Sequence, residues 1–193
     1  MAGKINKSAI RSKAMNSPKF TRAAQREAKT KFERAKAGLL QDFLNDVVTN
    51  EIRGGNVASN SSGTLGGYGN LFSYIGFYEG FDPVAPIEEY LRNFAFQARA
   101  VNRKGSLTLS IKWPSMSVIK NLSKMPWEEG NSWVEGIERG ISGFSNYMYD
   151  LASGKGRSKA AIQKKSDMGL VSTFSTRRYL PSMLMEAQKR FRK

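Results

Sequence analysis

Four glutamates lie close together in the second half of the chain, and they are the residues best suited to chemistry. Two neighbouring acids can act as acid and base when their pKa values are split, or they can bind a hard cation through oxygen. Nothing near them in the sequence supplies the rest of such a site, so solvated or interface acids are the favoured interpretation. If these glutamates have a function, we expect it to be ion pairing between subunits, with Arg139 as a partner. The four are Glu128, Glu129, Glu135 and Glu138.

A second candidate is the run G-K-G-R-S-K at 154–159, because glycine amides and lysine side chains can cradle a phosphate. The run lacks the G-x-x-x-x-G-K-[ST] spacing of a nucleotide-binding loop and does not lie between a predicted strand and a helix. A solvated loop, or one that contacts phosphate without enclosing a nucleotide, fits better. The residues predicted to face a polyanion come from this loop and from the N-terminal arm: Lys4, Lys7, Arg11, Lys13, Lys155, Arg157 and Lys159.

The third candidate is a glycine-rich loop over 53–70 that leads into the aromatic run L-F-S-Y-I-G-F-Y at 71–78. Glycines favour tight turns, and the aromatic and β-branched run favours a strand. Base stacking is disfavoured, because 68–81 contains no lysine or arginine. The alternatives are a hairpin over the domain's own core and a contact between subunits. For the second, the predicted interface residues are Gly66, Gly67, Leu71, Phe72, Tyr74, Phe77, Glu135, Glu138 and Arg139.

The composition narrows the classes of function that the chain can have. The 193 residues include no cysteine and no histidine. Disulfides, thiolate chemistry and the commonest general base and zinc ligand are therefore excluded. We expect a protein that is not an enzyme and has no cofactor or metal. We also expect no secretory peptide and no membrane segment, because the chain has no long apolar run.

Charge is concentrated at the two ends of the chain. The formal net charge is +15. Residues 1–36 and 154–193 each carry a net charge of about +9, whereas 37–153 is mildly acidic, at about −3. Such ends attract polyanions through phosphate neutralisation and counterion release. They could equally be solvated arms or contact acidic proteins, and no motif for sequence-specific readout is present.

Amphipathic patterns define the elements that must position these groups. Residues 1–16 are predicted to form a flexible basic arm. Ser17-Pro18 then predicts a helix start, and the stripe Phe32, Ala35, Leu39, Phe43 and Val47 continues a long helix to about Glu51. A second helix is predicted from Asp82-Pro83 to just before Asn102.

In the second half of the chain, some segments have a clear hydrophobic pattern and others have an ambiguous one. The alternating run 107–113 predicts a half-buried strand, and 114–126 is left unassigned. Residues 131–151 are assigned to a helix despite three glycines, each of which costs about 1 kcal/mol in a helix. A basic loop over 152–169, a short strand over 170–174 and a C-terminal helix opened by Tyr179-Leu180-Pro181 complete the chain.

The sequence therefore predicts one α+β domain over 17–193. Its long N-terminal helix would pack on a small, mostly antiparallel sheet, together with a second helix and a C-terminal helix. Basic arms would extend from both ends.

The order of three short motifs resembles the neck and tail-completion proteins of tailed bacteriophages. A T-G-x-L-type turn corresponds to Gly63, Thr64 and Leu65, or to Gly69, Asn70 and Leu71. An aromatic-x-x-x-E-x-G motif corresponds to Trp133, Glu138 and Gly140. A P-F-L-x-P-A-like start of the last helix corresponds to Tyr179, Leu180, Pro181 and Met183. The turn departs from the family order, in which threonine precedes glycine, and the middle segment is longer than usual.

The resemblance implies a structural subunit without a cofactor that forms a closed ring, commonly a hexamer, in the neck or at the tail end of the virion, after assembly in the host cytoplasm. Its partners would be copies of itself and other neck, tail tube, sheath or connector proteins, with DNA in the channel as a further candidate. The alternative, drawn from charge alone, is a nucleic-acid-binding protein without sequence preference.

Overall fold

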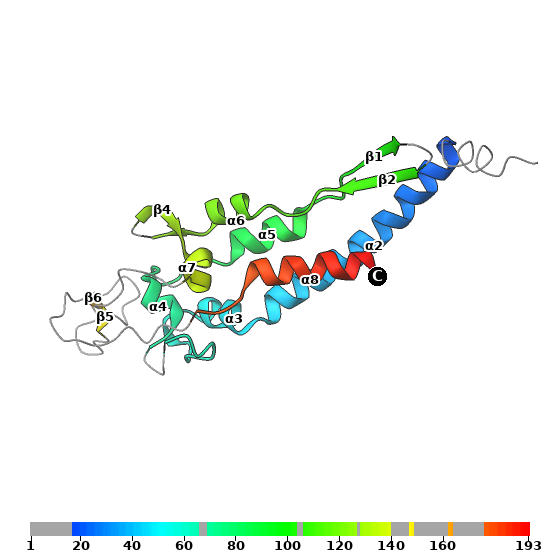
Figure 1. Cartoon of the computed structure of the whole chain (residues 1–193). Coiled ribbons are helices and arrows are strands. Elements are labelled where there is room, and N and C mark those ends of the chain that lie inside the picture. The colour runs from blue at the N-terminus through cyan, green and yellow to red at the C-terminus, as the bar shows by residue number, and fades with distance from the viewer. Residues whose placement is uncertain are drawn as a thin grey trace, which may run out of the picture.

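The computed structural model describes residues 17–65, 69–103, 106–126, 128–139, 147–148, 162–163 and 176–193. It is an α+β structure, as predicted, with a long N-terminal helix, small antiparallel two-stranded sheets and a C-terminal helix. The molecule is elongated. The start of the N-terminal helix and a β-hairpin lie at one end, and a group of short helices lies at the other (Figure 1).

The predicted long helix is present but is interrupted once. Ser17 caps α2 (Pro18–Asn45) by accepting a hydrogen bond from the Phe20 amide, and Pro18 occupies the first turn. Asp46 is extended, and its Oδ1 accepts from the Val48 amide at 2.8 Å, which starts α3 (Val47–Arg53). Because the break changes the helical register, Val48 is buried, whereas Val47, predicted on the stripe, is only half-buried.

The predicted strand over 71–78 is wrong. After the 3₁₀ turn η1 (Gly55–Val57), residues Leu71–Ile75 form the short helix α4. The Asn70 side chain caps its start, and Gly76, at φ 80°, ends it in a left-handed conformation. Paired caps of this kind define one helical turn even in a run with high β-propensity.

The second predicted helix is shorter than expected. It starts after Asp82, whose Oδ1 accepts from the Val84 and Ala85 amides, and α5 spans Ala85–Asn93. The chain then forms β1 (Ala98–Arg103), which pairs antiparallel with β2 (Ser106–Ile111), Ala98 opposite Ile111. The predicted strand is confirmed, with half-buried Leu107, Leu109, Ile111 and Trp113 alternating with exposed Thr108, Ser110 and Lys112.

Short elements follow the hairpin. The unassigned connection contains α6 (Met116–Leu122) and β3 (Lys124–Met125), which pairs antiparallel with β4 (Glu128–Ser132). The predicted helix over 131–151 is confirmed only for α7 (Trp133–Arg139). Further along, β5 (Tyr147–Met148) pairs with β6 (Ile162–Gln163), so the helix prediction is wrong there.

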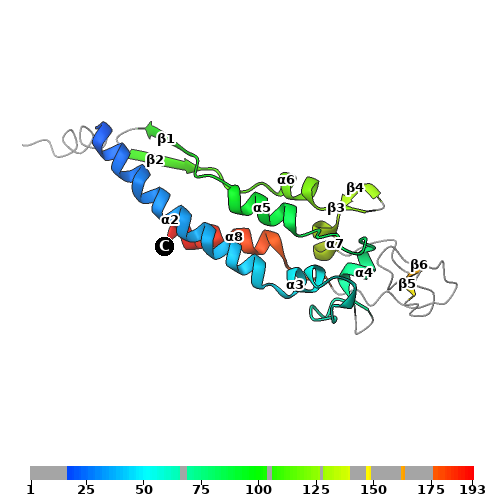
Figure 2. The same ribbon diagram turned by 180° about the vertical axis from the view of Figure 1, so that it is seen from behind.

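The C-terminal helix α8 (Leu180–Arg192) is confirmed and lies antiparallel along the second half of α2 (Figure 2). The Arg190 guanidinium pairs with Asp42 at 2.7 Å, and Phe191 contacts Trp113, which also contacts Phe32. The core therefore runs along the inner faces of α2, α5 and α8 and into the short helices. Its largest buried side chains are Trp133, Tyr179, Phe32, Phe43, Phe72 and Phe77.

Several predictions fall outside the described residues. They concern the arm over 1–16, the strand over 170–174 and most of the basic loop over 152–169. The individual residues in this group are Lys4, Lys7, Arg11, Lys13, Gly66, Gly67, Gly140, Lys155, Arg157 and Lys159.

Candidate functional site: a junction of three motif segments

The three segments that carry the resemblance meet at one end of the molecule, and Glu51 holds the first of them. Glu51 lies in α3 and is 1% exposed. Its Oε2 accepts from the Ser62 amide and its Oε1 from the Leu71 amide, both at 2.7 Å. One buried carboxylate thus fixes the glycine-rich loop both before and after its turn.

Asn70 holds the same loop from its other side. Its Oδ1 accepts from the Ser73 amide, and its Nδ2 donates to the carbonyls of Asn56 and Ala58, each at 3.0 Å. With the Ser62 and Thr64 hydroxyls 2.9 Å apart, the described part of the loop is an ordered turn built on side-chain hydrogen bonds.

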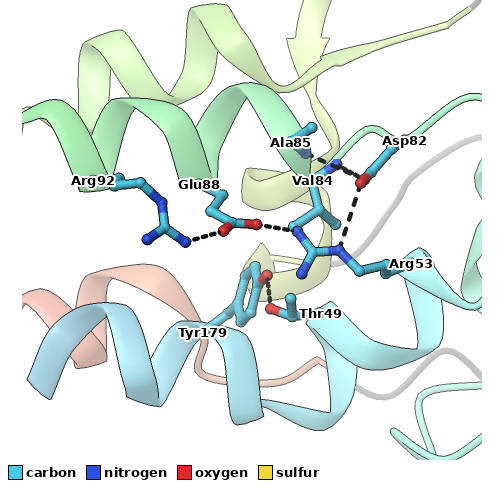
Figure 3. A network of polar contacts seen from close by, with 8 residues as sticks. All are labelled: Thr49, Arg53, Asp82, Val84, Ala85, Glu88, Arg92 and Tyr179. Atoms are coloured by element: carbon cyan, nitrogen blue, oxygen red, sulfur yellow. Dashed lines mark hydrogen bonds and ion pairs between the residues drawn. The ribbon is translucent and has the colours of Figure 1, made fainter. Parts of the chain in front are cut away.

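Tyr179 joins the last motif to the other elements. Its ring packs against Phe43 and Trp133, with centroids 6.1 and 6.3 Å away. Its hydroxyl lies 2.5 Å from that of Thr49 in α3 (Figure 3). Burial raises the pKa of Tyr179 far above its ordinary value, so the phenol stays protonated and can donate to Thr49.

Glu138 connects the middle motif to the last one. Its Oε1 accepts from the Tyr179 amide at 3.1 Å, and the neighbouring Arg177 amide donates to the Ile137 carbonyl at 3.0 Å. The Arg177 guanidinium reaches the Ser62 carbonyl in the glycine-rich loop at 3.2 Å. Burial raises the pKa of Glu138, since the hydrogen bond offsets only part of the desolvation.

A network of ion pairs fixes α5 to α3 beside this junction (Figure 3). The Glu88 carboxylate accepts from Arg92 and from Arg53, and Arg53 also lies 3.5 Å from Asp82. Hydrogen bonds from Arg92 and then Arg53 hold the pKa of Glu88 below its ordinary value. Because Arg53 and Asp82 are partly exposed, the network orients the elements more than it stabilises them.

The arrangement is suited to holding elements together, because Glu51, Asn70, Glu138 and Tyr179 all bind groups of the same chain. Two buried polar atoms beside them, Asn60 Oδ1 and Ser73 Oγ, have no hydrogen-bond partner among the described residues. In the part of the chain that the structure describes, no group of three or more acidic side chains could hold a metal ion. An open pocket of about 390 Å³ lies beside the junction, but its carboxylates are engaged: Asp42 with Arg190, Asp46 with the Val48 amide and Glu186 with Lys189.

The structure changes the assignment of the predicted interface residues. Leu71, Phe72 and Phe77 are at most 2% exposed, so they belong to the core of the chain and not to an exposed contact surface. Tyr74 is half-buried against the same core. Aromatic side chains of this segment do reach the surface, but they are Tyr78 at 56% and Phe81 at 53% exposure.

The predicted ionic residues are also engaged within one chain. Glu135 pairs with Lys120 at 2.7 Å and with Arg139 at 2.5 Å, and mainly the Lys120 contact holds its pKa below the ordinary value. Glu138 faces the Tyr179 amide instead. The ion pairs that were expected between subunits therefore form within one chain, whereas the Arg139 side chain remains 75% exposed.

Sequence reasoning missed the roles of Glu51 and Thr49 and named Asn70 only within the turn motif, although Glu51 and Asn70 each leave a signal. An acid within the apolar last turns of a helix, just before a glycine-rich loop, indicates a carboxylate that binds backbone amides of that loop. An asparagine directly before a short apolar run, with glycine six residues later, is typical of a single capped turn.

The function has to be inferred from the geometry of the chain itself. No protein-family model, curated protein or solved structure matches the chain. Among the described residues, no helix is both long and apolar enough to cross a membrane.

Proposed function

We propose that this chain is a structural virion protein of a tailed phage: a ring-forming subunit of the neck or tail-completion type, acting as a terminator or head–tail adaptor and not as an enzyme. The observation that carries the proposal is the contact among the three motif segments. They are separated by about 60 and 40 residues in the sequence, yet they share hydrogen bonds and ring contacts at one place.

This convergence supports the proposal because motifs of one family scaffold are expected to lie in contact. Ser62 and Arg177, which flank the turn motif and the last motif, are hydrogen-bonded to each other, and the middle motif is bonded to the last motif through Glu138 and Tyr179. The three motif segments thus contribute residues to one structural unit of the chain.

Ring closure requires two different surfaces of one protomer to meet. One candidate surface is the junction end, where Tyr78 and Phe81 lie exposed on the turn after α4 and Val57 in η1 is 87% exposed. Aromatic side chains of this kind contribute strongly to protein contacts. They replace the buried Leu71, Phe72 and Phe77 as the proposed contact residues.

Native mass spectrometry and negative-stain microscopy of the purified chain, alone and with the other neck and tail proteins of its phage, test the proposal. We expect discrete closed rings. The variant Tyr78→Ser/Phe81→Ser should shift the population toward monomers and keep its far-ultraviolet circular dichroism. The control Phe20→Ser/Met185→Ser removes two hydrophobic side chains that are 42% and 55% exposed on other elements and should still assemble.

Persistent monomers of the wild-type chain, even beside its partner proteins, would contradict the proposed function. Equal loss of assembly in both double variants would contradict only the assignment of the contact to the turn after α4.

A further inference from the structure

The first turns of α2 carry a stripe of four exposed cations. Lys19, Arg22, Arg26 and Lys29 follow one another at spacings of three, four and three residues. At 3.6 residues per turn they fall within an arc of about 80° on one side of the helix, over a length of about 15 Å. All four are exposed, and no other residue between Lys19 and Lys29 falls within that arc.

None of these cations forms an ion pair within the part of the protein that the structure describes, and the acid next to them on the same side of α2 is Glu33, four residues after Lys29. The ion pair of Lys31 with Glu27 lies on another side of α2, and none of the described ion pairs involves a stripe residue. The first turn of α2 contains no acidic residue. Cations at this end also oppose the helix dipole, so an anionic partner would relieve repulsion that the protomer leaves in place.

The spacing of the stripe fits a polynucleotide backbone. Duplex DNA carries one phosphate per 3.4 Å of axis on each strand, so about 15 Å of duplex presents enough phosphates for all four of the long, flexible cationic side chains. We propose that this stripe on α2 binds the phosphate backbone of duplex DNA without reading its sequence. The inference does not depend on ring formation.

Two observations favour duplex DNA over the other anionic partners. Binding to single strands relies on aromatic side chains that stack on bases, and the exposed aromatic of this region, Phe20, projects from another side of α2. An acidic protein would be expected to meet an apolar centre within a polar rim, and the stripe has no apolar residue between its cations.

Fluorescence anisotropy of a labelled 25-base-pair duplex with the full chain, over 50–200 mM salt, tests the inference. Four phosphate contacts give a slope of about −3.6 in log K against log salt, which is a loss of about 10²-fold over this range. The variant Lys19→Gln/Arg22→Gln/Arg26→Gln/Lys29→Gln should make the slope shallower by about 3–4. The control Lys124→Gln/Arg178→Gln/Arg192→Gln/Lys193→Gln removes the same charge from exposed positions elsewhere and should change the slope by less than one.

Each alternative outcome is distinct. An equal loss in both variants would assign binding to net charge, and no loss in either would assign it to other segments, such as the arm over 1–16. Tighter binding of a single strand, or equal binding of poly-glutamate at matched charge, would identify another class of partner. Any of these results would overturn the inference, while the oligomeric state of the stripe variant, measured separately, reports on the proposed function.

Discussion

Replacing Glu51 by glutamine tests whether one buried carboxylate organises the junction. The substitution keeps the size and shape of the side chain. It replaces two equivalent acceptors with one carbonyl oxygen and one amino group, and that amino group would face a backbone N–H. Either the Ser62 or the Leu71 amide, each now bonded at 2.7 Å, must lose its acceptor.

The expected cost follows from these two bonds. A hydrogen bond to a charged group contributes about 1.5–3 kcal/mol, and a buried N–H left without an acceptor costs about 1–3 kcal/mol. Since the two effects overlap at one amide, we expect Glu51→Gln to lower the free energy of unfolding by about 2–4 kcal/mol. For a chain of this length, that corresponds to a fall in Tm of roughly 5–15 °C.

Urea unfolding at pH 7 measures the change, with Glu89→Gln as the control. Glu89 is exposed on α5, and its replacement should stay within about 0.5 kcal/mol of wild type. Hydrogen exchange should show selective loss of protection at the Ser62 and Leu71 amides. If Glu51→Gln matches the control in stability and leaves both amides protected, the carboxylate does not hold the loop and the description of the junction is wrong.

Two further predictions concern Tyr179 and its partners. The raised pKa of Glu138 means that its ionised form is disfavoured by folding: the contribution of this group is fully present below the unfolded pKa and is lost as the pH rises through the folded pKa. Glu138→Gln, which keeps an acceptor for the Tyr179 amide, should therefore be at least as stable as wild type at pH 7 in urea unfolding, with the difference shrinking toward pH 4; a lower stability at pH 7 would refute this. Thr49→Val and Tyr179→Phe should each cost about 1–3 kcal/mol by leaving a buried hydroxyl unpaired, and the double variant should cost less than the sum, whereas strictly additive losses would show that the hydroxyls do not interact.

Periodicity predicted the elements that are long or regularly patterned. The stripe of α2, the alternation of β2 and the start of α8 after Tyr179 all follow from local pattern and caps. The errors have local and non-local causes. Asp46 ends α2 because its carboxylate caps the next helix. The hydrophobic periodicity does not reveal this cap. Residues 98–101 leave the predicted helix because β2 supplies a partner strand, a contact that no local propensity reveals.

The site was predictable only in part. The motif order selected Trp133, Glu138 and Tyr179, which do meet, but the residues that hold them, Glu51 and Thr49, carry no motif. The aromatic composition of 71–78 suggested a surface for protein contacts, whereas the fold buries most of that run and exposes Tyr78 together with the nearby Phe81. Composition cannot decide which side of an aromatic segment faces solvent, because that depends on how α4 packs against its neighbours.

Charge is distributed unequally over this elongated fold, and the distribution separates the two proposals. At the junction end, acidic side chains bind amides or cations of the same chain and so hold its elements together. They are Glu51, Glu88, Glu135 and Glu138. In the first turns of α2, four exposed cations take part in none of the described ion pairs. The start of α2 and the short helix α4 lie at opposite ends of the molecule in both views (Figures 1 and 2). An assembly contact at the turn after α4 therefore leaves the cationic stripe free for a polyanion, and substitutions in one surface need not disturb the other.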